Sequence, residues 1–172
     1  MMYDKILGIA ACDPQGIMGK KGRLPWHYPL EIQHFRETIG ASPLIMGHAT
    51  FLTLPAHYFE GRTTIIFSRA KHQPKHPHHQ YFVSSLEEFH ALKGNYQTLY
   101  VIGGAQVFRL FLEANLIEAC ILTKLIHSFD GDTLFPLPLL NGWKEQILKT
   151  TADFAIFRYT NPLEIPHAHK NS

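Results

Sequence analysis

The sequence predicts a single α/β domain, in which a mostly parallel sheet is covered by helices. The first observation is that short β-like runs alternate with helical patterns along the chain. The second is that several β-like runs are continuously apolar, which is typical of central strands buried on both faces. The third is the length of 172 residues, which suits one domain with a substantial core. We therefore expect eight strands in one central sheet, flanked by about four helices.

The predicted strands recur from the N-terminus to the last third of the chain. Each is a short apolar or β-branched run bounded by glycine, proline or polar residues. They are residues 5–12, 42–47, 62–68, 80–84, 98–104, 118–126 and a late pair within 144–160.

The predicted helices are marked by their apolar spacing and by their ends. Pro29 suits a first helical position, because its missing N–H would have no partner there. Ser85 and Glu88 have the spacing of a capping box, and Gly94 suits a helix end. The four predicted helices span residues 29–40, 48–55, 85–94 and 105–115.

Composition excludes several classes of protein. The chain has 16 basic and 14 acidic residues, so it lacks the basic excess of a nucleic-acid binder. Cys12 and Cys120 lie in apolar, strand-like runs, where a free thiol acts as a small buried side chain rather than as half of a disulfide. The apolar run at the N-terminus is too short for a signal peptide or a membrane span. We expect a cytoplasmic protein with no membrane or nucleic-acid partner.

Histidines cluster in residues 71–80 and recur in residues 166–170. Zinc sites usually combine histidine with cysteine or carboxylate ligands at fixed positions, and residues 71–80 offer neither nearby. We interpret these histidines as belonging to solvated segments and predict no metal site.

Glu31 is an acid in a segment that otherwise looks ready for burial. It lies in the first turn of the predicted helix 29–40, and Phe35 follows one turn later on the same face. The carboxylate therefore points where the aromatic ring points. The alternative is a solvent-exposed acid that interacts with the helix dipole.

Three predicted strands end in residues suited to phosphate. Gly103 and Gly104 join a strand to a helix, where the backbone can approach a ligand and free N–H groups face an anion. Gly47 lies at a similar strand-to-helix junction, and Ser68 and Arg69 end another strand. The ligand-binding edge of an open α/β sheet has this arrangement. Taken alone, a Gly-Gly pair is more often only a tight turn.

The motifs together identify a resemblance to the dihydrofolate reductase family over nearly the whole chain. The matching segments are residues 9–36, 43–51, 60–69, 100–108, 121–123 and 130–136, in the family's order and spacing. The resemblance implies that residues 1–163 form the family's domain, with an antiparallel C-terminal strand and a mobile tail at 164–172. It also implies a monomeric enzyme that transfers a hydride from NADPH to dihydrofolate and binds antifolate inhibitors.

The resemblance assigns Glu31 to the pterin, whose 2-amino group and adjacent ring nitrogen would donate to the carboxylate. Trp26 and Thr123 would hold Glu31, and water admitted beside Leu24 would supply the proton to N5. Arg62 would clamp the glutamate tail of the substrate. The implied substrate contacts are Ala10, Ala11, Glu31, Phe35, Leu54, Phe59, Arg62, Ile102, Phe108 and Thr123.

The resemblance also gives a cofactor set and a mobile loop. Residues 16–26 would close over the nicotinamide, and Asp132 would latch the closed loop. The implied cofactor contacts are Ala11, Met18, Gly19, Gly47, His48, Ala49, Thr50, Phe67, Ser68, Arg69, Ile102, Gly103, Gly104, Ala105, Gln106, Val107 and Phe108.

The cofactor end departs from the family pattern. His48, Ala49 and Gln106 stand where many members have basic residues, so Arg69 is the clearest partner for the 2′-phosphate of NADPH, with Lys71 beside it.

Two alternative functions are a riboflavin-pathway reductase of the same fold and a non-catalytic folate or nucleotide binder. The first lacks the pterin signature seen here, and the second would need a defect that the sequence does not show.

Overall fold

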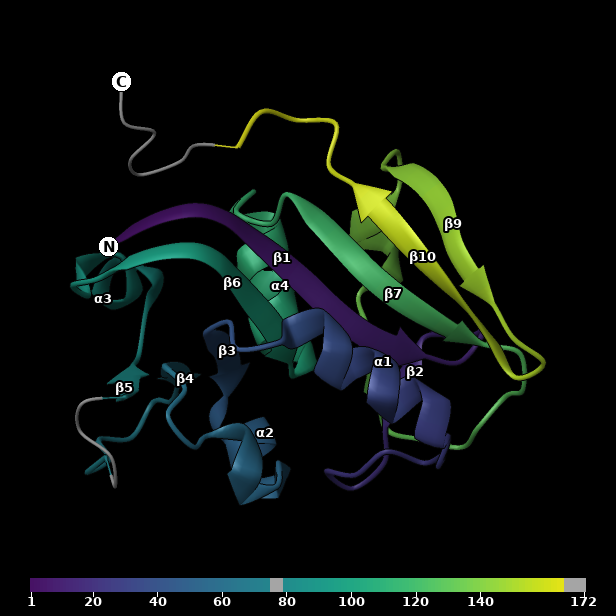
Figure 1. Ribbon diagram of the computed structural model, residues 1–172, viewed down its shortest axis with the longest axis horizontal. Helices are drawn as coiled ribbons and strands as arrows, with labels where there is room; N and C mark the ends of the chain where they lie inside the picture. The colour runs from purple at the N-terminus through teal and green to yellow at the C-terminus, as the bar shows by residue number, and fades with distance from the viewer. Residues whose placement is uncertain (75–78, 166–172) are drawn as a thin grey trace.

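The computed structural model describes residues 1–74 and 79–165. Eight strands form one sheet in the order β5-β4-β3-β6-β1-β7-β10-β9 (Figure 1). Their bounds are β1 Met2–Cys12, β3 Leu44–Gly47, β4 Thr64–Phe67, β5 Gln80–Val83, β6 Asn95–Gly103, β7 Ala119–Leu125, β9 Lys144–Thr150 and β10 Phe154–Thr160.

The strand directions confirm the predicted fold class. The pairs β1–β6, β1–β7, β3–β6, β3–β4 and β4–β5 are parallel. Strand β10 runs antiparallel to both of its neighbours, β7 and β9. The sequence did not indicate a small second sheet, in which β2 (Ile17–Gly19) pairs with β8 (Thr133–Leu134).

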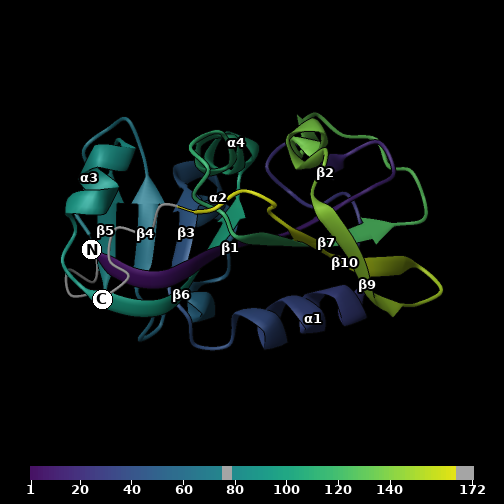
Figure 2. The ribbon, with the colours of Figure 1, turned by 90° about the horizontal axis from the view of Figure 1, so that it is seen from above.

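The helices divide between the two faces of the sheet. In Figure 2, α1 (Pro29–Ile39) lies below the sheet, while α3 (Leu86–Ala91) and α4 (Ala105–Glu113) lie above it. Buried side chains form a cluster on each face, one with Trp26 and Ile39 and the other with Phe89 and Phe111. The sheet is thus the middle layer of three, as the continuously apolar strands predict.

All four helices end before the predicted residue, α2 and α3 by the largest fraction of their length. Helix α2 spans His48–Thr53, because Pro55 disfavours helical geometry at the preceding Leu54, whose φ is −74° and ψ is 135°. Helix α3 starts as predicted, with Ser85 Oγ accepting a hydrogen bond from Glu88 N at 3.1 Å. It ends at Ala91, before the predicted stop. Two 3-10 helices, η1 (Ala56–Tyr58) and η2 (Leu137–Leu140), complete the fold.

The C-terminal end of the described chain packs on the domain. Asn115 donates to the carbonyl of Glu164 at 3.1 Å and Ile165 is buried, so the chain stays attached to the domain past residue 163. The rest of the predicted tail and residues 75–78 of the histidine-rich segment lie outside the described residues. Cys12 and Cys120 are free and buried, as predicted. Within the described ranges, no helix is long and apolar enough to cross a membrane.

Candidate active site

The predicted site residues come from elements that meet at the carboxyl ends of three parallel strands. Strand β1 ends just after Ala10 and Ala11, β3 ends at Gly47, and β6 ends at Gly103. Helices α2 and α4 begin directly after β3 and β6, and α1 lies against the same end of β1 (Figure 1). Open α/β sheets bind ligands at this edge.

Glu31 is a buried acid whose proton affinity is strongly altered. Its side chain is 8% exposed, although it lies only in the first turn of α1. Burial raises the pKa of Glu31 to about 7, and the nearby Trp26 indole lowers it in part. That contact falls short of a well-formed hydrogen bond, because Trp26 Nε1 is buried without a partner among the described residues. Glu31 is thus an acid that can be neutral or charged near neutral pH.

Trp26 and Thr123, the two residues predicted to hold this acid, are both buried. The Trp26 ring packs on Phe129, with ring centroids 5.5 Å apart. Thr123 is 1% exposed and pairs with Ala11 in the parallel ladder between β7 and β1. Leu24, in contrast, is 54% exposed, so its position is open to solvent.

The predicted wall of the substrate end gathers on the α1 face of the sheet. Ala11, Phe35, Leu54, Phe59 and Ile102 are partly buried and pack on the same cluster as Trp26. Tyr58, which sequence reasoning left out, packs its ring on Phe35 at a centroid distance of 5.7 Å. Phe59 instead contacts Phe51 at 4.8 Å. If the predicted alignment of residues 55–62 is shifted by one residue, Tyr58 takes the place predicted for Phe59. The position of η1 in the structure decides between the two alignments.

Arg62 is held by the backbone of two neighbouring segments. Its Nε donates to Tyr58 O at 2.8 Å, and its two terminal nitrogens donate to Ser42 O and Gly40 O at 2.6 Å each. A guanidinium carries five N–H groups. Three are used in these contacts, so two remain for a ligand.

The Gly-Gly turn adjoins α2 at the predicted phosphate region. Gly103 has a φ of 139°, which favours glycine, and a side chain built at this position would meet Thr50 Oγ1 at 3.4 Å. A side chain built at Gly47 would meet Val107 at 3.3 Å. Gly104 is the N-cap of α4 and offers no side-chain cap, so the first N–H groups of α4 are free for an anion.

The next strand end carries a histidine that sequence reasoning missed. Ser68 Oγ and His72 Nε2 are 2.8 Å apart, and the His72 ring stacks on His48 at a centroid distance of 4.2 Å. Arg69 and Ala49 are exposed beside them. His72 belongs to the histidine-rich run in the sequence, and nothing in its spacing separates it from its neighbours.

The predicted mobile loop at residues 16–26 is hydrogen-bonded to Asp132. Lys20 and Arg23 close a tight turn through Lys21 and Gly22, both with positive φ, of 49° and 77°. Lys21 N donates to Asp132 Oδ2 at 2.9 Å, and Asp132 N donates to Gly19 O at 3.0 Å. The predicted latch residue thus contacts the loop.

The remaining predicted contacts lie on the other side or at the rim. Phe108 is fully buried against Phe135, at a centroid distance of 5.1 Å. It belongs to the core cluster with Phe89 and Phe111, on the face of the sheet opposite α1. Ala10, Met18 and Phe67 are partly buried against the same core cluster. Ala105 is half-buried and Gln106 is exposed at the start of α4.

Comparison with known proteins agrees with this geometry. A family model described as Dihydrofolate reductase matches residues 5–158. The chain is 34% identical over 143 residues to the dihydrofolate reductase of Lactococcus lactis subsp. lactis, covering 76% of this chain and 77% of that protein. It is 31% identical over 146 residues to the dihydrofolate reductase of Gallus gallus, covering 74% and 75%.

A solved structure extends the similarity to three dimensions. Dihydrofolate reductase from Enterococcus faecalis, complexed with NADP(H) and RAB-propyl, superposes with a TM-score of 0.73 at 27% sequence identity. The match covers 91% of this chain and 95% of that one. The chain therefore belongs to the dihydrofolate reductase family.

Proposed function

We propose that this chain reduces 7,8-dihydrofolate to 5,6,7,8-tetrahydrofolate, with Glu31 as the residue that binds and orients the pterin ring. Membership of the family makes the chain an NADPH-dependent oxidoreductase. The assignment of roles to individual residues is the further step, and it is supported by the burial and hydrogen bonding of the described side chains.

The observation that carries this proposal is a contrast between two buried carboxylates. Asp13 is fully buried, and its oxygens accept three main-chain hydrogen bonds. The donors are the N–H groups of Gln15, Ile17 and Phe129. Glu31 is buried without such a set of donors among the described residues. Leaving a buried carboxylate without partners is costly, so Glu31 is suited to a ligand that brings its own donors.

A pterin ring supplies the donors that Glu31 lacks. Its 2-amino group and the adjacent ring nitrogen present two parallel N–H groups to the two carboxylate oxygens. Those donors favour the charged form and lower the pKa of Glu31 from its raised value. The charge on Glu31 then favours protonation of the ring at N5. Leu24 is exposed, so water can reach N5 beside it.

The chemistry of the residues at the ends of β3, β6 and β4 suits NADPH. When bound, NADPH supplies the hydride. Gly47, Gly103 and Gly104 leave the backbone bare where a diphosphate must approach closely. The uncapped start of α4 offers N–H groups and a positive dipole end to the same diphosphate. Arg69 places a cation at the end of the next strand, where it can recognise the 2′-phosphate.

Arg62 and the loop complete the proposed site. The two free N–H groups of Arg62 can pair with the α-carboxylate of the substrate's glutamate tail, and also with antifolates that carry such a tail. Closure of residues 16–26, held by Asp132, shields the reacting rings from bulk solvent and leaves only the path beside Leu24 for the water that protonates N5. We also propose a cytoplasmic monomer with one domain, which extends past the predicted boundary at 163 to include the contacts of Glu164 and Ile165. The free buried thiols support a reducing compartment.

A spectrophotometric assay tests the proposed reaction. Absorbance of NADPH should fall when dihydrofolate is added to the purified protein, and it should not fall with the aminopyrimidine substrate of the riboflavin pathway. Oxidation with the aminopyrimidine alone would assign the chain to the alternative reductase. Binding of both NADPH and dihydrofolate without oxidation would make it a binding protein.

A further inference from the structure

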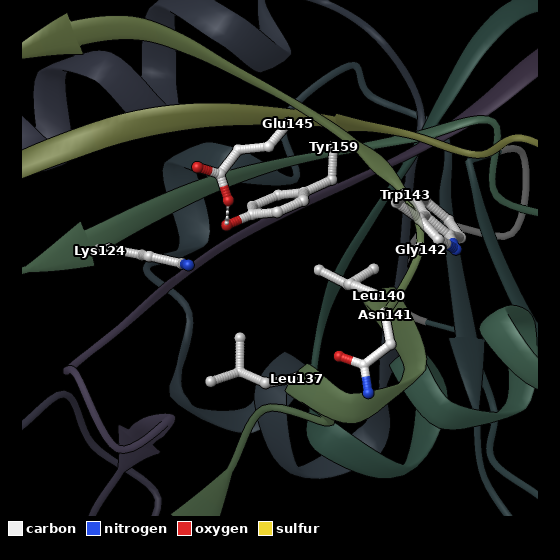
Figure 3. Close-up of a pocket in the computed structure, with 8 residues that line it drawn as sticks. All are labelled: Lys124, Leu137, Leu140, Asn141, Gly142, Trp143, Glu145 and Tyr159. Atoms are coloured by element: carbon white, nitrogen blue, oxygen red, sulfur yellow. Dashed lines mark hydrogen bonds between the residues drawn. The ribbon is translucent and has the colours of Figure 1, made fainter.

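A cavity lies on the face of the sheet opposite Glu31 and takes no part in the proposed reaction. It has a volume of about 320 Å³ and lies between the end of β7, η2 and the pair β9–β10 (Figure 3). Thr123 pairs with Ile156, which packs on the α1 side of the sheet. Lys124, the next residue, lines the cavity, because successive side chains of a strand point to opposite faces.

The cavity contains a cation that has no carboxylate partner. The ammonium of Lys124 points into the space between Tyr159 and Leu137 (Figure 3). It lies 5.1 Å from the centroids of the Phe157 and Tyr159 rings, so aromatic faces already partly stabilise the charge. The ion pairs found within the described ranges are Lys20–Asp130 and Arg109–Glu113, and neither involves Lys124.

The acid that lines the cavity, Glu145, is hydrogen-bonded to Tyr159, which also lines it. Glu145 Oε2 accepts a hydrogen bond from the Tyr159 hydroxyl at 2.8 Å. Glu145 is exposed, whereas Lys124 is half-buried. Water and salt screen an exposed charge more than a partly buried one. The charge of Lys124 is therefore the less screened of the two, which favours an anion beside Lys124.

Apolar side chains and polar groups share the rest of the lining. Leu137 and Leu140 border the cavity on one side, Trp143 borders its rim, and the Asn141 amide adds a polar group (Figure 3). Sites for small molecules have volumes of roughly 300–1,000 Å³, so this cavity suits a ligand the size of a single ring.

We propose that this cavity is a second small-molecule site, which takes a compact monoanion with a flat apolar body, such as an aromatic carboxylate. The carboxylate pairs with the ammonium of Lys124, and the ring packs on Leu137 and Leu140. Asn141 donates from its amide to the second carboxylate oxygen.

Nuclear magnetic resonance titration of the full chain with sodium benzoate tests the site. The sequence has two tryptophans, and the Trp143→Phe variant identifies which indole N–H resonance belongs to Trp143. Benzoate should shift the Trp143 resonance saturably, with a Kd of about 1–10 mM, while the Trp26 resonance stays in place. Benzamide, which has the same shape without the charge, should bind about tenfold more weakly. Sodium chloride at equal concentration controls for ionic strength.

Two variants separate this site from general binding. Lys124→Met should weaken benzoate binding about tenfold, whereas Lys93→Met, at an exposed lysine away from the cavity, should leave it unchanged. Asn141→Phe, at the exposed rim, should fill the cavity and remove the shift even if Lys124→Met does not fold. The proposal is overturned by the absence of a saturable shift, by equal binding of benzamide, or by unchanged binding in a folded Lys124→Met or Asn141→Phe protein.

Discussion

The main-chain N–H of Lys21 donates a hydrogen bond to Asp132 Oδ2 at 2.9 Å, so the carboxylate of one loop holds the tip of another. Both residues are exposed. The pKa of Asp132 is lowered by this bond first and by the Thr133 hydroxyl second. The contact therefore joins the loop over the proposed nicotinamide position to the residue that precedes β8.

Asp132→Ala should slow turnover while leaving the fold intact. The loop loses one hydrogen bond to a charged group at a solvent-exposed position, which costs about 1 kcal/mol. This free energy corresponds to about a fivefold change in the equilibrium constant for loop closure. A stopped-flow measurement of hydride transfer should show a drop of about fivefold. Asp4→Ala, at another exposed acid, is the matched control. An unchanged rate in Asp132→Ala would mean that this contact does not govern closure.

Removing Arg62 should affect both the fold and the binding of the glutamate tail. Arg62→Leu leaves three carbonyl oxygens without their donor, which should lower the free energy of unfolding by roughly 1–3 kcal/mol. It should also weaken a methotrexate-like ligand at least about tenfold. A trimethoprim-like ligand, which lacks the tail, should change by about threefold at most.

Equilibrium titration of both ligands, at a temperature where the variant is folded, separates the two roles of Arg62. Arg36→Leu, at an exposed arginine of α1, controls for loss of surface charge. Equal losses for the two ligands in Arg62→Leu would assign Arg62 to the fold alone.

Arg69 should determine the preference for NADPH over NADH. The 2′-phosphate is the difference between these cofactors, and charge-assisted hydrogen bonds to it contribute roughly 1.5–3 kcal/mol. Arg69 is exposed, so its contribution to binding the 2′-phosphate should lie at the lower end of this range. Arg69→Ala should therefore reduce the ratio of the Kd for NADH to the Kd for NADPH about tenfold. Fluorescence titration with each cofactor measures this ratio, with Lys93→Ala as control. If the ratio holds, His48, His72 or Lys71 is the next residue to test.

The raised pKa of Glu31 should make stability depend on pH. The pKa is about 7 in the folded chain and 4.5 without burial, so the folded state binds more protons between these values. The contribution of Glu31 to stability should be greatest below about pH 4.5 and should fall as pH rises through about 7, by about 3 kcal/mol. Glu31→Gln should not lose this stability as pH rises, because glutamine does not ionise. Urea unfolding of ligand-free protein at pH 5 and pH 8 should show a smaller decline in the variant, and equal declines would contradict the burial argument.

The fold was predictable because its signals are local. Continuous apolar runs indicate central strands, and Pro29, Ser85 and the glycine junctions indicate helix ends. The β2–β8 sheet was not predictable, because each strand is only two or three residues long and exists through contact with the other. The end of α2 required weighing Pro55 against a pattern that otherwise continued.

The site was predictable where a side chain has an unusual neighbourhood in the sequence, as Glu31 does between Trp26 and Phe35. It was less predictable where register or backbone contacts decide. Tyr58 rather than Phe59 packs on Phe35. The three carbonyl partners of Arg62 come from segments up to 22 residues away along the chain. Such contacts leave no periodic signal in the sequence.

The most direct test of the central claim is the rate of NADPH oxidation by Glu31→Gln with dihydrofolate at pH 7. Glutamine keeps the size of the side chain but removes the charge that pairs with the pterin, so kcat/KM for dihydrofolate should fall at least about 100-fold, or about 2.7 kcal/mol. The Kd for NADPH should stay within about threefold, which shows that the variant is folded at the cofactor end. A kcat/KM near that of the parent protein, with NADPH binding intact, would contradict the role of Glu31 in the reaction.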